Sequence, residues 1–194
     1  MRLTWKATDA VPGVATTGLS LSANGGLSYT IVKLSGPKST TATLNLVPGV
    51  AYRFRAKAID GRGNDSGWLP IGQLTLRRTQ ETSGSVVWRG SWSRASDSRL
   101  SAGASRRTTT SGARATFTFS GRTILWVATR GARGGRAKVW IDGVSAGVVD
   151  TRLSSTAFRR TVFAKTLAKG GLHRIEIRAL GDGFVDVDAF LVLP

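Results

Sequence analysis

The chain has 194 residues, of which 41% are hydrophobic, a content that excludes wholesale disorder. It has no cysteine, which excludes disulfides, thiol nucleophiles and cysteine-ligated zinc. Its 28 Lys and Arg residues outnumber 11 Asp and Glu residues for a net charge of +17, which favours polyanionic partners without saying which one.

Short alternating segments, separated by turns, fill the first half of the chain. Apolar and polar residues alternate with the period of a β-strand, and turn signals such as Asn24-Gly25-Gly26 stand between the segments. No apolar pattern has the period and length of a helix. We therefore expect β-strands at residues 3–7, 18–22, 27–34, 41–46, 51–59 and 71–76.

This half resembles a fibronectin type III domain over about residues 2–78. The matching features are an early Trp5, Pro48-Gly49 ahead of Tyr52-Arg-Phe-Arg-Ala-Lys-Ala58, and Asp60 with Gly63-Asn64 after it. The resemblance implies a β-sandwich in which the Tyr52 hydroxyl bonds back to the chain and fixes a corner. We place this first domain at residues 1–82.

Trp5 resembles the tryptophan of that family's second strand, so no residues remain for a first strand. A missing strand exposes a sheet edge with unpaired backbone groups. Two explanations stay open: further sequence precedes this chain, or a segment from elsewhere fills the edge and drives self-assembly.

The second half follows a polar linker at residues 79–84 and forms an expected domain at 83–194. Strands are predicted at 86–92, 113–119, 123–128, 137–142, 144–150, 161–167, 173–179 and 184–193. Strands of this number and length suit a jelly roll. The predicted fold class is all-β, with a fibronectin type III-like sandwich followed by a jelly roll.

Four segments of this half resemble the galactose-binding-like jelly rolls found among carbohydrate-binding modules. They are Gly112-Ala-Arg-Ala-Thr-Phe-Thr-Phe-Ser-Gly121, Ala137-Lys-Val-Trp-Ile-Asp-Gly143, Leu167-Ala-Lys-Gly-Gly-Leu-His-Arg-Ile-Glu-Ile177 and Val187-Asp-Ala-Phe190. The resemblance implies the jelly-roll fold of these modules. It leaves the ligand open, because one architecture serves many functions.

Trp140 and Lys138 are the first ligand-binding candidates. Val139 and Ile141 share the parity expected to face the core, which turns Trp140 and Lys138 to the other face. An aromatic ring there can stack on a sugar, or it can pack under a loop. Trp126 lies in an apolar run and is expected in the core, and Trp88 in the core or at an interface.

Arginine clusters supply the remaining ligand candidates: Arg130, Arg133 and Arg136, and the pair Arg159-Arg160, with Arg106-Arg107 as a third cluster. Arginine binds carboxylates and phosphates through paired hydrogen bonds. If the clusters converge they form a polyanion site. If they lie at opposite ends they give a diffusely charged surface.

Asp186 and Asp188 are candidate ligands of a structural calcium ion, which related jelly rolls often hold near the final strand. Calcium needs about 6–8 oxygens, and the acidic pair expected on the first strand is missing at Val87-Trp88-Arg89. The one histidine, His173, is expected to be a turn residue capped by a backbone group. No zinc, P-loop, Rossmann or Ser-His-Asp motif appears.

These features predict a non-catalytic extracellular or cell-surface module of a bacterial protein that binds polysaccharide or an anionic wall polymer. The start of the chain, Met1–Trp5, reads as a strand rather than a signal peptide, and no stretch approaches the ~20 apolar residues of a membrane span. The alternatives are a fibre or surface-layer subunit and a nucleic-acid-binding protein, the last resting on charge alone.

Overall fold

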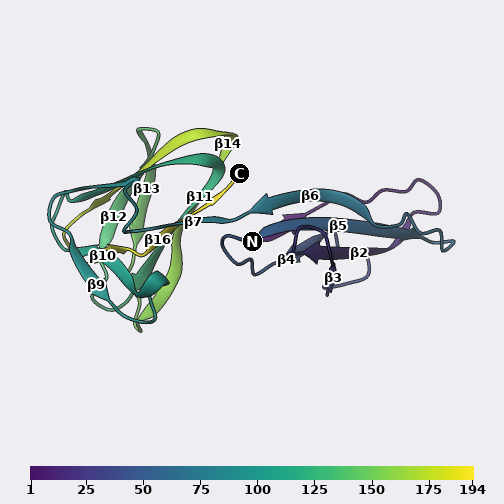
Figure 1. Cartoon of the computed structure of the whole chain (residues 1–194), viewed down its shortest axis with the longest axis horizontal. Helices are drawn as coiled ribbons and strands as arrows, with labels where there is room; N and C mark the ends of the chain where they lie inside the picture. Colours follow the sequence, from purple (N-terminus) through teal and green to yellow (C-terminus); the bar gives the residue numbers. More distant parts are fainter. The chain divides into compact units, whose positions relative to one another are not determined.

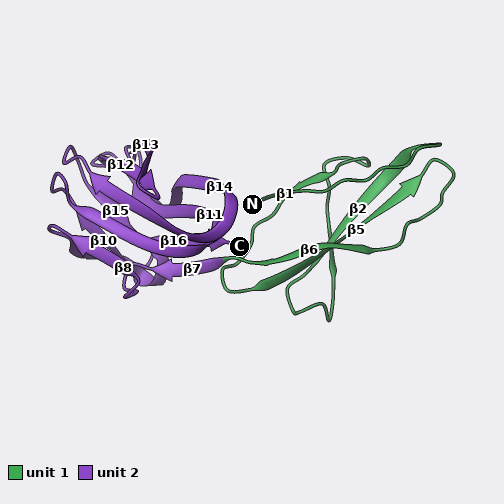
Figure 2. Ribbon diagram, turned by 90° about the horizontal axis from the view of Figure 1, so that it is seen from above, with its two compact units in different colours: residues 1–76 green, residues 77–194 purple.

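The computed structural model describes residues 1–194 as an all-β chain (Figure 1). Its single helical element is the 3₁₀ turn η1 (Ser101–Gly103), and no helix is long and apolar enough to cross a membrane. The chain divides into two compact units, Met1–Leu76 and Arg77–Pro194 (Figure 2). The predicted all-β sandwich class is confirmed.

The division between the units falls earlier than the boundary placed after residue 82. The reason is the strand β7 (Arg77–Gln80), which overlaps the predicted linker at residues 79–84. It pairs with β16 (Ala189–Leu193), the last strand of unit 2. Its pattern is polar on both faces, so it lacks the apolar alternation that marks a strand.

Unit 1 contains two antiparallel sheets. The smaller sheet pairs β1 (Arg2–Thr4) with β4 (Thr41–Thr43). The larger has the order β3-β2-β5-β6, made of β2 (Val14–Ser22), β3 (Thr30–Val32), β5 (Ala51–Asp60) and β6 (Leu69–Thr75). Strand pairing covers only one edge of β1 and one edge of β4, since these two strands pair with each other alone.

The corner hydrogen bond predicted at Tyr52 is present. Its ring is buried, and its hydroxyl oxygen accepts a hydrogen bond of 2.9 Å from the backbone N–H of Val47. Alternation along β5 buries Tyr52, Phe54 and Ala56. The assignment of unit 1 to the fibronectin type III family stays a prediction.

Unit 2 contains a seven-stranded and a three-stranded sheet. The larger has the order β13-β12-β14-β11-β16-β7, with β8 also paired to β11, and the smaller has the order β15-β10-β9. The strands not yet placed are β8 (Val86–Arg89), β9 (Ser93–Ser96), β10 (Ala104–Thr108), β11 (Arg114–Arg130), β12 (Arg136–Ile141), β13 (Val144–Asp150), β14 (Ala157–Ala179) and β15 (Val185–Val187).

The two longest strands, β11 and β14, are each one strand where the sequence predicts two. Gly121 and Gly171 interrupt the predicted strands, but they stand opposite each other in the β11–β14 ladder. The pairing register shifts just after Gly121, which marks an irregularity between the two halves. A side chain at Gly121 would lie 2.5 Å from the Leu193 carbonyl oxygen, so the close approach of β16 requires glycine there.

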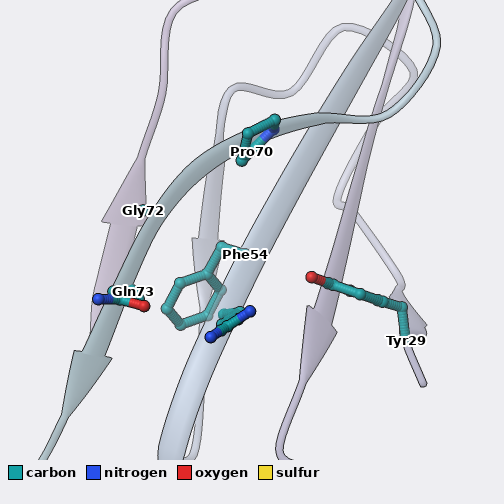
Figure 3. A pocket seen from close by; sticks show the side chains of 6 residues that line it. Tyr29, Phe54, Pro70, Gly72 and Gln73 are labelled. Carbon is teal, nitrogen blue, oxygen red and sulfur yellow. The ribbon is translucent and has the colours of Figure 1, made fainter. Parts of the chain in front are cut away.

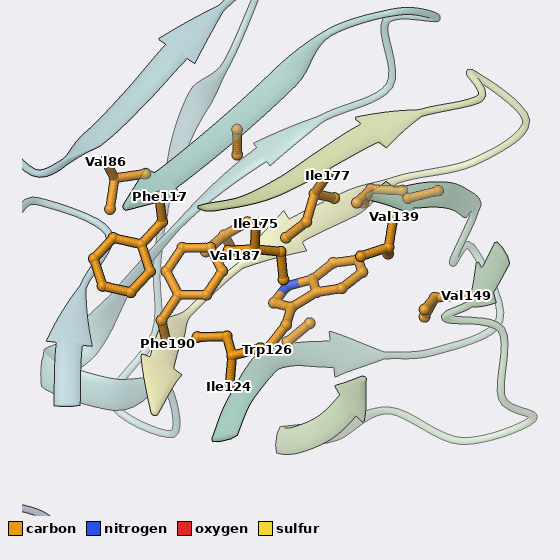
Figure 4. Close-up of a cluster of buried hydrophobic side chains, with 14 of the residues drawn as sticks. Val86, Phe117, Ile124, Trp126, Val139, Val149, Ile175, Ile177, Val187 and Phe190 are labelled. Carbon is orange, nitrogen blue, oxygen red and sulfur yellow. The ribbon is translucent and has the colours of Figure 1, made fainter. Parts of the chain in front are cut away.

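The core of unit 2 is one aromatic and aliphatic cluster (Figure 4). Trp126 is fully buried, as predicted, and its indole N–H donates a 3.0 Å hydrogen bond to the Asp186 carbonyl. Phe117 stacks on Phe190 with ring centres 4.8 Å apart. Trp88 is half-buried and packs against the same cluster. This core fixes which residues of β11, β12 and β14 face outward.

Candidate functional site

The outer face of β12 carries the two residues predicted there. Val139 and Ile141 are buried in the core, whereas Lys138 is exposed and Trp140 is half-buried. Because side chains alternate between the faces of a sheet, Lys138 and Trp140 share the outer face. The parity prediction is confirmed.

Strand β14 lies beside β12 and surrounds Trp140 with charged groups. Trp140 stands opposite Glu176, and Lys138 stands opposite Arg178. The Arg178 guanidinium carbon lies 4.7 Å from the centre of the Trp140 ring, a cation–π contact that covers part of the indole. Trp140 is therefore an oriented ring with one side already occupied by a cation.

Glu176 ties the surrounding arginines together. It accepts hydrogen bonds of 2.8 Å from Arg178 and 3.2 Å from Arg174. Burial alone would raise the pKa of Glu176. The positive charges of Arg178, Arg174 and the nearby Arg114 have the larger effect, so the pKa of Glu176 lies below its ordinary value. The carboxylate is charged at neutral pH and holds both guanidinium groups in place.

A depression of about 180 Å³ opens at this point of the sheet. It is lined by Trp140, Gly143, Arg174, Glu176 and Arg178. The lining combines a flat aromatic ring with two guanidinium groups and a carboxylate. Such a set can stack on an apolar ring face and donate or accept several hydrogen bonds.

The β12–β13 turn completes the rim of the depression. Asp142 and Gly143 both have positive φ, which suits a two-residue hairpin turn. The Asp142 carboxylate accepts a 2.8 Å hydrogen bond from the Arg174 backbone N–H and lies 2.7 Å from Nδ1 of His173. These two partners lower the pKa of Asp142 and join the turn to β14.

His173 has no free ring nitrogen. Nδ1 faces Asp142, and Nε2 lies 3.2 Å from the Lys169 carbonyl oxygen. The ring contacts a backbone carbonyl as predicted, but His173 lies within β14 (Ala157–Ala179) rather than in a turn.

Arg130 ends β11 and Arg136 begins β12, and both belong to a hydrogen-bond network with Arg152 and Asp182. Arg136 precedes Lys138 by two residues on β12, but its Nε is 2.6 Å from the Asp182 carboxylate. Arg152 also binds Asp182, at 2.8 Å, and its carbonyl oxygen accepts a hydrogen bond from Arg130. The pKa of Asp182 is lowered, mainly by a hydrogen bond from the Arg136 backbone N–H and also by one from the Arg136 side chain. Arg133 is exposed and makes no side-chain hydrogen bond.

Arg159 and Arg160 lie at the other end of the β11–β14 ladder. Arg160 stands opposite Ala128 near the end of β11, whereas Arg178 stands opposite Arg114 at its start. Arg159 donates hydrogen bonds to the carbonyl oxygens of Ser98 and Leu100. Neither residue lines the depression beside Trp140.

Arg106 and Arg107 make local contacts on β10. The Arg106 guanidinium lies 5.2 Å from the Trp88 ring centre, and Arg107 lies 4.2 Å from the Phe184 ring centre and 3.5 Å from Asp186. Local contacts thus engage most of the arginines in the clusters predicted from the sequence.

Asp186 and Asp188 are both fully buried. Asp186 accepts a 2.7 Å hydrogen bond from the Thr129 N–H and a 3.2 Å bond from the Ser105 hydroxyl. Asp188 accepts a 2.8 Å bond from the Ser101 N–H, and its second oxygen has no partner. Burial raises the pKa of both carboxyls, that of Asp188 to about 7 with further contributions from Asp186 and Glu81.

This acidic pair does not by itself fit calcium. The ion takes about 6–8 oxygens, and both oxygens of Asp186 already have partners within the protein. No group of three or more His, Cys, Asp or Glu side chains is placed to hold a metal ion. The structural calcium stays a prediction.

Unit 1 has a larger depression of about 390 Å³ beside β5 and β6 (Figure 3). Its lining is Tyr29, Arg53, Phe54, Pro70, Gly72 and Gln73. The neighbouring Arg55 stacks on Tyr29, with its guanidinium carbon 3.4 Å from the ring centre. Only one charged side chain lines this depression, so it offers fewer directed contacts than the one beside Trp140.

The predicted site residues do not include Arg174, Glu176 and Arg178. The signal was available, since residues 173, 175 and 177 share one parity and the alternating partners are all charged. What the sequence could not supply is the register that sets Arg178 against Lys138 and Glu176 against Trp140.

No protein-family model matches the chain. Over an alignment of 157 positions that covers 76% of the chain, the sequence is 31% identical to the A type blood N-acetyl-alpha-D-galactosamine deacetylase of Flavonifractor plautii. The match covers 20% of that enzyme, so the chain spans about a fifth of the length of this relative.

Several solved structures are similar to part of the chain. The CBM35 module of Cellvibrio japonicus Abf62 matches with a TM-score of 0.47 and 14% identity, over 60% of this chain and 91% of that one. A CBM36-1 domain of a multidomain xylanase from the hindgut metagenome of Trinervitermes trinervoides gives 0.45 and 14%, over 62% and 97%. A family two carbohydrate esterase from Cellvibrio japonicus gives 0.47 and 12%, over 62% and 34%.

Proposed function

We propose that the chain is a non-catalytic carbohydrate-binding part of an extracellular bacterial protein. Polysaccharide would bind the outer face of β12 and β14 at the depression beside Trp140. The observation that carries the proposal is the joint lining of this depression by an oriented indole, two guanidinium groups and a carboxylate. The sugar-directed name of the relative supports the same class of ligand.

The indole provides apolar contact with a sugar, and the charged groups provide hydrogen bonds that orient it. The flat ring offers a surface for the C–H face of a sugar. Arg174 is mostly exposed and has donors directed toward solvent, so it can bind hydroxyl or carboxylate oxygens. Because sheet strands hold these residues, the site is formed before the ligand arrives, which lowers the entropic cost of binding.

The proposal assigns no catalytic role to this face. The carboxylate that lines the depression, Glu176, is engaged by two arginines, and the one on its rim, Asp142, is engaged by His173 and the Arg174 backbone. Glycoside hydrolysis ordinarily uses a pair of carboxyl groups that are free to react.

Affinity electrophoresis of the whole chain in gels that contain neutral and acidic polysaccharides tests the proposal. We expect retardation in at least one gel, loss of retardation in Trp140→Ala, and retention in Trp140→Phe, which keeps a flat ring. Trp68→Ala in unit 1 is the matched control, because Trp68 is also half-buried and contacts cations. Retardation that Trp140→Ala leaves unchanged would overturn the proposal.

A further inference from the structure

Four cations form a row across the face that carries Trp140. In the antiparallel ladders Lys138 stands opposite Arg178, Arg178 opposite Arg114, and Arg114 opposite Arg89. The row therefore crosses β12, β14, β11 and β8 at right angles to the strands. Neighbouring strands lie about 4.8 Å apart, so the row is about 14 Å long.

All four side chains point away from the core. The residues next to them, Val139, Ile177 and Ala115, are buried, and Trp88 packs against the core beside Arg89. Lys138 and Arg89 are exposed, and Arg114 and Arg178 are half-buried. Alternation along the strands thus places the row on the solvent side of the sheet.

The row has little compensating charge. Glu176 pairs with Arg178 and Arg174 and lies near Arg114, but no ion pair of the structure includes Lys138, Arg114 or Arg89. Like charges directly opposite each other in a sheet are destabilising. Fold stability does not explain the arrangement, whereas an anionic ligand laid across the strands would.

We infer that this row binds an extended acidic polysaccharide, one with a carboxylate or sulfate group on successive sugars. The inference rests on the proposed function and names its substrate class. The inter-strand spacing is close to the length of one sugar ring in an extended chain, so each sugar can present its acidic group to one cation. Charge-assisted hydrogen bonds from Arg and Lys suit both kinds of group.

The surroundings of the row favour a glycan over nucleic acid. Proteins that bind single strands use several aromatic side chains on which successive bases stack. Beside this row stands one ring, Trp140, and the next positions along the same line are Glu176, Thr116 and Val87. A single ring beside a row of cations suits a glycan in which one sugar stacks on the ring and the acidic groups of the next sugars contact the cations.

Titration calorimetry with four polymers tests the inference: polygalacturonate for carboxylates, dextran sulfate for sulfates, dextran as the neutral chain and poly-dT as nucleic acid. We expect one of the two acidic glycans to bind most tightly. The triple variant R89Q/R114Q/K138Q should bind it roughly ten-fold or more weakly. The control R133Q/R160Q/K165Q removes the same charge from exposed positions elsewhere and should change affinity by less than about two-fold.

A thermal melt of the triple variant checks its fold, and we expect it to be at least as stable as the parent because like-charge repulsion is relieved. Equal weakening in the triple variant and its control would overturn the inference. So would poly-dT that binds as tightly as the glycans. Binding of dextran that needs Trp140 but not the row would overturn the inference and leave the proposed function standing. No binding of any glycan would overturn both.

Discussion

The Arg178 guanidinium carbon lies 4.7 Å from the centre of the Trp140 ring. The two residues lie on different strands, and the pairing register of β12 with β14 brings them together. The contact does two things. It restricts the orientation of the indole, and it leaves a cation beside the ring where a charged sugar would lie. Arg178 therefore belongs both to the depression and to the cationic row.

Removal of Arg178 should weaken polysaccharide binding even though Trp140 remains. We expect Arg178→Ala to reduce affinity roughly ten-fold, because both the orientation of the ring and a binding cation are lost. Arg178→Lys should lose less, since it keeps the charge without the planar fork. In a Trp140→Ala background, Arg178→Ala should cost less than in the parent, because only the binding cation remains to be lost. Fully additive losses in this double-mutant cycle, measured by calorimetry, would contradict a coupled pair.

The buried Asp188 should make unit 2 less stable as the pH rises toward neutrality. Its pKa is raised to about 7 by burial and by the nearby acids, against about 3.9 for an unfolded aspartate. Between these values the folded state binds more protons than the unfolded state, so the free energy of unfolding falls with increasing pH and then levels off above about 7.

Asp188→Asn should flatten this slope, because the neutral amide keeps an oxygen for the Ser101 N–H. Urea denaturation from mildly acidic to mildly alkaline pH measures the effect. We expect the free energy of unfolding of the variant, relative to that of the parent, to be highest at the alkaline end of this range. A slope that Asp188→Asn leaves unchanged would show that the residue titrates alike in the folded and unfolded states.

The Tyr52 hydroxyl should contribute to the stability of unit 1. Tyr52→Phe removes the acceptor of the 2.9 Å hydrogen bond from Val47, and we expect a loss of about 1 kcal/mol in the free energy of unfolding. Tyr29→Phe is the matched control, because the Tyr29 hydroxyl makes no hydrogen bond and its ring keeps the stack with Arg55. Denaturation followed by circular dichroism compares the two. Equal stability of both variants would argue against a corner held by this bond.

Gly135 should resist substitution, because two backbone segments meet there. A side chain at this position would lie 2.6 Å from the backbone of Gly183. We expect Gly135→Ala to destabilise unit 2 by about 2 kcal/mol through overpacking. Gly84→Ala meets no atom within 4 Å and should be neutral. A neutral Gly135→Ala in the same thermal melts would mean that the segment from Gly131 to Arg136 moves aside freely.

Local patterns in the sequence predicted the inward and outward residues of single strands. Alternation at Val139 and Ile141 placed Trp140 outward, and the apolar run around Trp126 placed that ring in the core. Alternation did not predict strands that are held by pairing with neighbouring strands rather than by an apolar face. Strand β7 is polar but is held by β16, and β9 and β10, which no apolar pattern marks, are held by pairing with each other and with β15.

The candidate site depends on register, which the sequence did not specify. Lys138, Arg178, Arg114 and Arg89 are far apart in the chain, and only the ladders of four strands put them in line. The arginine pairs that stand out in the sequence are different. Arg159, for example, is used to bind the carbonyl oxygens of a neighbouring loop. Clustering along the chain was therefore a poor guide to clustering in space.

The most direct test of polysaccharide binding beside Trp140 follows the indole N–H signals of the six tryptophans by NMR during titration with polygalacturonate and with dextran sulfate. Trp→Phe variants assign the signals. We predict that the Trp140 signal moves with at least one of these polymers while those of the core residue Trp126 and of Trp68 in unit 1 stay in place. Movement of the Trp68 signal alone, or of none, would contradict the assignment of the binding face.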